Sequence, residues 1–163
     1  MADDYEKLMK QGYQLMEEGE FPQALSKFDK AIKAKPEAPD AYLAKADAAV
    51  VVPKVAQEEV LVLYKKAAEM DPANPMVQQS MAAFCMDVGL FNDGEAAYNK
   101  AAELDPENAP YYFSEFAVEY YRKAQIVYED KLDETTRVII KKKSLKYLLR
   151  SINLDEESVK KLL

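Results

Sequence analysis

Three segments of this chain are versions of one pattern: Ala24–Ala31 reads ALSKFDKA, Val60–Ala67 reads VLVLYKKA, and Gly94–Ala101 reads GEAAYNKA. Each has an aromatic residue at its fifth position, alanine at its eighth, and proline five residues beyond its end. The aromatic residues at 28, 64 and 98 are therefore 36 and then 34 residues apart. A period near 34 residues predicts an array of helical hairpins.

The other residues that recur with this period have physical roles at helix crossings and helix ends. Two antiparallel helices can approach closely only where the side chains at their crossing are small. Proline ends a helix because it cannot continue the hydrogen-bond ladder, and Asn74-Pro75 has the form of a helix start. The small residues at the predicted crossings are Gly12, Ala46 and Ala82 on the first helices, and Ala24 and Gly94 on the second helices.

With these landmarks, the chain resembles the tetratricopeptide repeat family over about residues 5–108. The resemblance implies an all-α fold, an α-solenoid of antiparallel helix hairpins, with first helices on the concave face. We expect three repeats within residues 1–108. The second repeat has two extra residues near Val52-Pro53-Lys54, which lengthen its inner loop.

Residues 109–163 diverge from the repeat and are expected to form part of the same domain. Phe116 occupies the position of the small residue, and the segment is about 16 residues too long for the period. We expect an elongated hairpin near 110–130 and 133–152, with Asp133 capping its second helix. A short C-terminal helix follows and could cap the array. The basic residues Lys141, Lys142, Lys143, Lys146 and Arg150 are interpreted as a solvated helix face.

The composition argues against several classes of function. The chain has no histidine, the commonest metal ligand and a frequent catalytic base. It has one cysteine, Cys85, and no glycine-rich phosphate loop. We therefore expect no enzyme activity, no metal and no cofactor. A net charge of −7 disfavours nucleic acid as a partner. No apolar run is long enough to cross a membrane, and the acidic start lacks a signal pattern, so a cytoplasmic protein is expected.

The resemblance implies a concave groove in which peptides lie. Its expected residues make the groove largely apolar, with a few acids at the edge, and suit an extended apolar segment or an amphipathic helix. The chain would then be a protein-interaction adaptor with micromolar affinity. Alternatively, many of these residues are core between neighbouring first helices. The residues expected in the groove are Met9, Tyr13, Met16, Leu43, Asp47, Met76, Gln79, Ala83, Met86, Phe113 and Tyr120.

Some members of this family clamp the acidic C-terminal tail of heat-shock chaperones with cationic side chains. The corresponding positions here carry no cation, so we do not expect a carboxylate clamp. Those positions are Met9, Tyr13, Ala44, Met76 and Ser80.

A second hypothesis comes from the aromatic residues of the last hairpin. Dense aromatic side chains need a partner surface, either the neighbouring helices or a second copy of the chain. In the second case the chain would be a self-assembling structural protein that forms a homodimer. The residues expected at that dimer surface are Tyr112, Phe116, Tyr121 and Tyr128.

Overall fold

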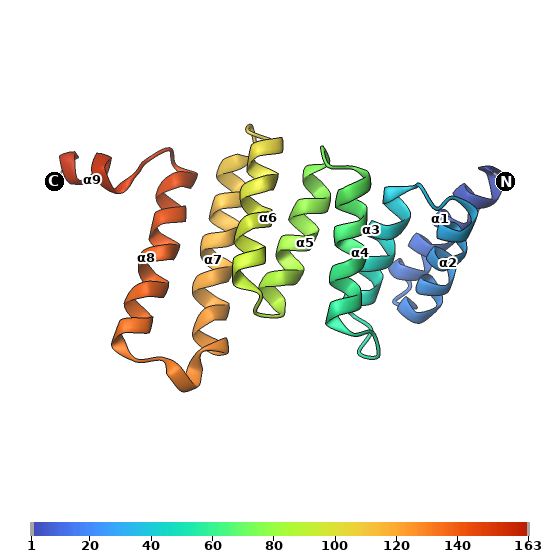
Figure 1. Cartoon of the computed structure of the whole chain (residues 1–163), viewed down its shortest axis with the longest axis horizontal. Helices are drawn as coiled ribbons and strands as arrows, with labels where there is room; N and C mark the ends of the chain where they lie inside the picture. The colour runs from blue at the N-terminus through green and yellow to red at the C-terminus, as the bar shows by residue number, and fades with distance from the viewer. Residues whose placement is uncertain (1, 163) are drawn as a thin grey trace. The chain divides into compact units, whose positions relative to one another are not determined.

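The computed structural model describes the backbone of residues 2–162 and the side chains of residues 4–161. Within this range the chain is all-α, with helices connected by short turns and no strand. Figure 1 shows the helices in chain order. Their bounds are α1 Ala2–Glu17, α2 Phe21–Ala34, α3 Pro39–Val50, α4 Gln57–Met70, α5 Pro75–Asp87, α6 Phe91–Leu104, α7 Ala109–Val127, the 3-10 helix η1 Glu129–Lys131, α8 Glu134–Ser151 and α9 Glu156–Leu162.

The chain divides into two compact units, Met1–Ser80 and Met81–Leu163, and the boundary falls within α5. Unit 1 contains the hairpins α1–α2 and α3–α4, and α3 packs against both α1 and α2. Phe28 is fully buried at the centre of this packing. A Cβ atom at Gly12 would lie only 2.3 Å from Cε1 of the Phe28 ring. The absence of a side chain at Gly12 therefore allows α1 to lie directly on the ring.

Two kinds of turn recur between the helices. Within a hairpin, Gly19 and Gly89 adopt φ +79°, a left-handed conformation that closes the end of α1 and of α5. Between hairpins, the residue after each of α2, α4 and α6 leaves the helical conformation, with ψ between 74° and 79°, and precedes Pro36, Pro72 or Pro106. Asn74 Oδ1 accepts a hydrogen bond of 3.0 Å from Met76 N at the start of α5, which confirms the predicted cap.

Unit 2 is built on a cluster of aromatic rings. The buried ring of Phe116 lies 4.4 Å from that of Tyr147, 5.4 Å from that of Tyr120 and 6.2 Å from that of Tyr98, centroid to centroid. Phe116 replaces the small residue found at the same position of the earlier hairpins. The predicted elongated hairpin is confirmed as α7 and α8, and Asp133 accepts a 2.7 Å hydrogen bond from Thr136 N.

Part of the predicted solvated basic face is instead bonded to α6. Lys143 Nζ lies 2.7 Å from Oε2 of Glu95, and Arg150 donates to Oδ1 of Asn99 over 2.9 Å. Between them, the Tyr147 hydroxyl donates to Glu95 and accepts from Asn99. Because these contacts fix α8 against α6, the interpretation of a solvated face is wrong for Lys143 and Arg150. Lys141, Lys142 and Lys146 are exposed.

Candidate functional site

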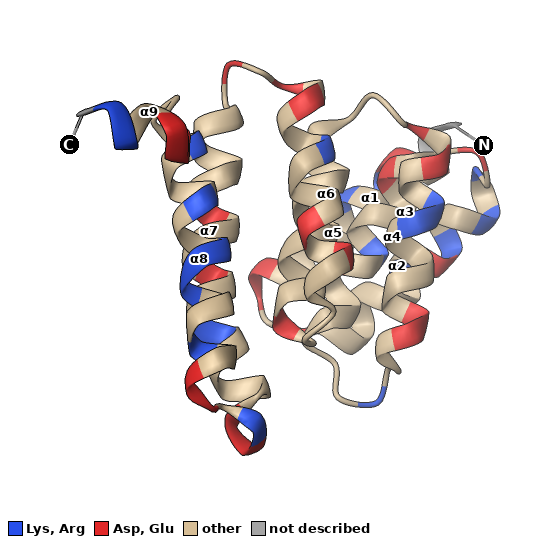
Figure 2. Ribbon diagram, turned by 60° about the vertical axis from the view of Figure 1, so that its left-hand side comes forward, with Lys and Arg blue, Asp and Glu red and all other residues tan. Residues whose placement is uncertain are grey.

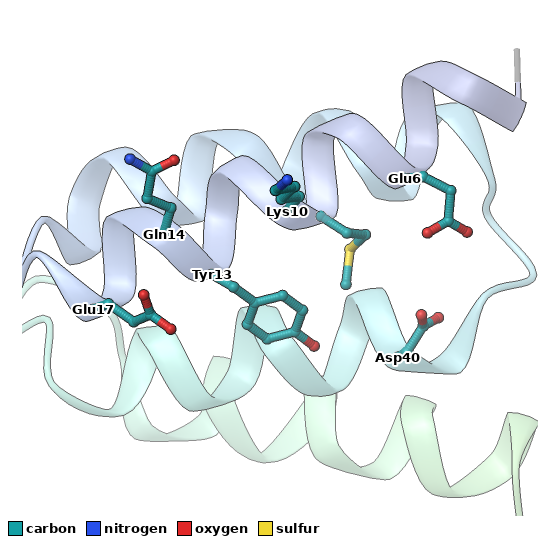
Figure 3. Close-up of a pocket in the computed structure, with 7 residues that line it drawn as sticks. Glu6, Lys10, Tyr13, Gln14, Glu17 and Asp40 are labelled. Carbon is teal, nitrogen blue, oxygen red and sulfur yellow. The ribbon is translucent and has the colours of Figure 1, made fainter.

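The candidate site is a hollow on unit 1, formed where α1 lies beside the start of α3 (Figure 3). Its volume is about 510 Å³. The α1 residues that line it recur at intervals of three and four, so they share one helix face. The lining residues are Glu6, Met9, Lys10, Tyr13, Gln14, Glu17 and Asp40.

Tyr13 stands at the middle of the hollow, half exposed at 46%. Its ring meets the buried Phe28 ring edge-on, with 5.5 Å between centroids. This contact fixes the tyrosine against the core of unit 1 and leaves part of the ring open. Burial, followed by the charges of Asp40 and Asp47, raises the pKa of the Tyr13 hydroxyl. At neutral pH the hydroxyl is therefore a neutral hydrogen-bond donor beside carboxylates.

Two carboxylates near Tyr13 are held by buried tyrosines. The Tyr5 hydroxyl donates to Oδ1 of Asp40 over 2.5 Å, and the Tyr64 hydroxyl donates to Oδ1 of Asp47 over 2.8 Å. Burial raises the pKa of the Asp47 carboxyl, and the hydrogen bond from Tyr64 partly offsets this rise. Both carboxylates are therefore oriented before any partner arrives.

The charged side chains of the hollow are mostly acidic. Glu6, Glu17 and Asp40 bring three negative charges and Lys10 brings one positive charge. Met9 lines the hollow, but it is only 5% exposed and packs mainly into the core. The lining is therefore mixed, with polar and apolar surface in about equal shares, where a largely apolar groove was predicted.

The other residues expected in the groove differ widely in exposure. Met76 and Ala83 are exposed, whereas Met16, Leu43, Asp47 and Gln79 are half-buried. Met86 and Tyr120 are buried in the core of unit 2, so the prediction that they contact a partner is wrong. Met86 is buried because it fills the space beside Gly94, where a Cβ would lie 2.7 Å from its sulfur.

The aromatic residues of the last hairpin face different surroundings. Phe113 packs on Tyr147, with ring centroids 6.0 Å apart, and the Arg150 guanidinium lies 3.9 Å from the Phe113 ring centroid. The groove role expected for Phe113 stays a prediction. Tyr112 and Phe116 are buried, so the structure contradicts their assignment to a dimer surface.

Two residues of the expected dimer surface do reach solvent. Tyr121 and Tyr128 are partly exposed, and the Tyr128 ring lies 5.8 Å from that of Phe91. A dimer contact through these two tyrosines stays a prediction. The buried Tyr112 and Phe116 instead fill the core of unit 2.

Within the described residues, no group of three or more His, Cys, Asp or Glu side chains is placed to hold a metal ion. Cys85 is buried. No described helix is long and apolar enough to cross a membrane.

Replacing Asp47 by asparagine is expected to raise the free energy of unfolding at pH 7, by up to about 1 kcal/mol. The folded state raises the pKa of Asp47, so ionisation of this carboxyl lowers stability as the pH rises above its ordinary value of 3.8. Asparagine keeps an acceptor for Tyr64 and has no charge to bury. Urea unfolding at pH 4 and pH 7 measures the difference.

The gain from Asp47→Asn should be small at pH 4 and larger at pH 7. Glu37→Gln, which removes an exposed carboxylate between α2 and α3, is the control and should show little change at either pH. A gain for Asp47→Asn that is the same at both pH values would contradict the burial argument.

Comparison of the chain with protein-family models and with curated proteins finds no match. Solved structures do match. A structure entitled "Crystal structure of MamA" has a TM-score of 0.70 and 15% identity, covering 97% of this chain and 80% of that chain. "MamA 41-end from Desulfovibrio magneticus RS-1" has a TM-score of 0.69 and 18% identity, covering 96% of this chain and 76% of that chain.

A third match is entitled "First TPR of Spaghetti (RPAP3) bound to HSP90 peptide SRMEEVD". It has a TM-score of 0.65 and 16% identity, and covers 78% of this chain and 95% of that chain. The TM-scores show that the fold is shared, although the sequence identities are low. The matches agree with the repeated hairpins, small crossing residues and proline turns described above. The chain therefore shares the all-α fold of these structures, one of which is a tetratricopeptide repeat domain.

Proposed function

We propose that this chain is a protein-interaction module, and that the hollow of unit 1 binds an extended segment of a partner protein. The observation that carries the proposal is the half-exposed Tyr13, fixed on the core and surrounded by carboxylates. A tyrosine fixed in this way offers contact area at little cost in side-chain entropy. Within unit 1, the half-buried Met16 and Leu43 and the exposed Met76 are proposed to extend this surface. A partner contact of Ala83 in unit 2 stays a separate prediction.

The charge of the hollow favours a partner segment with a basic side chain. Glu6, Glu17 and Asp40 surround an opening that has one cation, Lys10. The RPAP3 domain is bound to a peptide, SRMEEVD, whose last residues are acidic. Carboxylates like those of its tail would meet like charge in this hollow, which supports a different specificity here. The proposed ligand pairs a lysine or arginine with a neighbouring apolar residue that packs on Tyr13.

The expected affinity is micromolar. One aromatic contact and a few partly exposed ion pairs offer only a few kcal/mol, because exposed pairs contribute about 0–1 kcal/mol each. Ordering an extended peptide opposes part of this gain. Weak affinity of this kind suits an exchangeable adaptor.

A peptide-display selection on the full chain tests the proposal. The enriched peptides are expected to share a basic residue next to an apolar residue, and to bind with a dissociation constant of about 1–100 μM. Glu17→Lys, which reverses a charge, and Tyr13→Ala, which removes the aromatic contact, should each weaken binding of the best peptide by about tenfold, as measured by fluorescence anisotropy. Circular dichroism should show unchanged helicity, because both side chains are on the surface.

Glu107→Lys is the matched control, since it makes the same change in charge at an exposed residue that does not line the hollow. The affinity of the Glu107→Lys variant for the selected peptide should stay within about twofold of the wild-type value. Peptides enriched in acidic residues, or equal losses for Glu17→Lys and Glu107→Lys, would refute the proposed site.

A further inference from the structure

A second surface, separate from the hollow, lies on unit 2 between α7 and α8. This α7–α8 groove encloses about 340 Å³. Exposed apolar side chains form its walls, among them Val118, which is 54% exposed, and Leu145, which is 53% exposed. Its lining residues are Ala117, Val118, Tyr121 and Arg122 of α7, and Lys141, Ser144, Leu145 and Leu148 of α8.

The repeat shows what kind of element such a groove holds. In unit 1, α3 follows the hairpin α1–α2 and packs on both of its helices. Small residues of α3, among them Ala41 and Ala44, enter the core formed with Phe28. In unit 2, the α7–α8 groove likewise lies between two consecutive helices of a hairpin. The shape between two antiparallel helices therefore suits a further helix.

The next helix of this chain, α9, does not fill that position. After α8, Asn153 takes a left-handed conformation with φ +56°, and Leu154 N bonds to the Leu149 carbonyl over 2.8 Å. The earlier connections instead have a residue with negative φ and ψ near 75°, followed by a proline. This different turn directs α9 away from α7 (Figure 1). As a result, Val118, Tyr121, Leu145 and Leu148 stay open, and the structure gives α9 no role as a cap over them.

The rim of the α7–α8 groove is basic. Arg122 and Lys141 line it, and Lys142 and Lys146 are exposed nearby on α8. Figure 2 shows basic residues along α8. On α7, Arg122 is already paired with Glu119, so the positive charge open to a partner comes mainly from Lys141, Lys142 and Lys146 of α8. A second copy docked face to face would bring these cations together, so the charge favours a partner with carboxylates.

The floor of the groove has an unsatisfied polar group. Ser144 is 4% exposed, and its hydroxyl has no hydrogen-bond partner among the residues that the structure describes. Because the oxygen itself is buried, an acceptor on a partner could pair with it only after the serine side chain rotates toward the groove. This observation is independent of the apolar walls and of the charge.

We propose that the α7–α8 groove binds an amphipathic helix of a partner protein, whose apolar stripe lies between Tyr121 and Leu145 and whose flanks are acidic. The stripe packs between two helices, as α3 does on the first hairpin. The acidic flanks meet Lys141 and the neighbouring exposed lysines of α8.

The test uses the full chain and a fluorescein-labelled helical peptide of about 20 residues. The peptide has leucine at helical spacing and glutamate on both flanks; a twin peptide has lysine in place of each glutamate. The acidic peptide is expected to bind with a dissociation constant of about 1–100 μM, more weakly as salt rises. The lysine twin should bind at least about tenfold more weakly.

Substitutions in the α7–α8 groove test whether the peptide binds there. Leu145→Glu should weaken binding of the acidic peptide by about tenfold or more. Lys141→Glu should weaken binding of the acidic peptide and strengthen binding of the lysine twin. Simple unfolding of the variant would not exchange the preference in this way. Val62→Glu is the matched control, because Val62 is an exposed valine on α4, 63% exposed, and its variant should bind like wild type.

Three results would overturn the proposal. One is equal binding of the acidic and lysine peptides, or no binding of either below about 1 mM. Another is a homodimer in analytical ultracentrifugation that Leu145→Glu dissociates, which would make a second copy the occupant. The last is a tenfold or larger gain in peptide affinity on deleting residues 152–163, which would make α9 the occupant.

Discussion

Replacing Phe116 by alanine is expected to lower the free energy of unfolding by about 3–5 kcal/mol. The ring is fully buried and contacts the rings of Tyr98, Tyr120 and Tyr147. Alanine removes these contacts and leaves a cavity that three fixed aromatic side chains cannot readily fill. Urea unfolding followed by circular dichroism measures the loss.

Val118→Ala is the control for Phe116→Ala, because Val118 lies on the same helix and is largely exposed. It should cost less than about 1 kcal/mol. Hydrogen exchange adds a positional readout, and amides of α7 and α8 should lose protection in Phe116→Ala. A loss below about 1 kcal/mol would mean that Phe116 does not organise this core.

Replacing Gly12 by valine is expected to destabilise unit 1 by about 2–4 kcal/mol. A Cβ atom there would lie 2.3 Å from Cε1 and 2.7 Å from Cζ of Phe28. Because the Phe28 ring is fully buried, it can move only by disturbing the packing of α1, α2 and α3. The midpoint of urea unfolding should fall accordingly.

A second substitution tests the cause of this effect. Adding Phe28→Leu to Gly12→Val should cost less than the sum of the two single changes, because leucine vacates part of the space that valine needs. Lys7→Val places the same side chain at an exposed position of α1 and should change stability by less than about 1 kcal/mol. Strict additivity of the two substitutions would contradict the steric explanation.

The repeat could be predicted from the sequence because its landmarks act locally. A proline such as Pro36, Pro72 or Pro106 cannot continue the helix before it, whatever its tertiary surroundings, and a glycine such as Gly19 permits a left-handed turn. Asp133 needs only the backbone of Thr136 to act as a cap. These residues fixed the helices and the elongated last hairpin, and the structure confirms both.

The character of the candidate site was harder to predict. Helical periodicity correctly placed Met9, Tyr13 and Glu17 on one face of α1. It could not say how deep each side chain lies, since depth depends on the helix packed against that face. Met9 packs mainly into the core and Tyr13 is half exposed, so the surface that was expected to be largely apolar is a mixed hollow with several carboxylates.

The sequence by itself determined the repeat period, the all-α fold and the positions of most turns, because each follows from the conformational limits of proline, glycine and small residues. Only the tertiary structure decided which apolar side chains meet solvent. It buried Met86 and Tyr120 and bonded Lys143 to Glu95. Through the left-handed Asn153 it also directed α9 away from α7. Exposure depends on contacts between residues distant in the chain, which a local pattern does not contain.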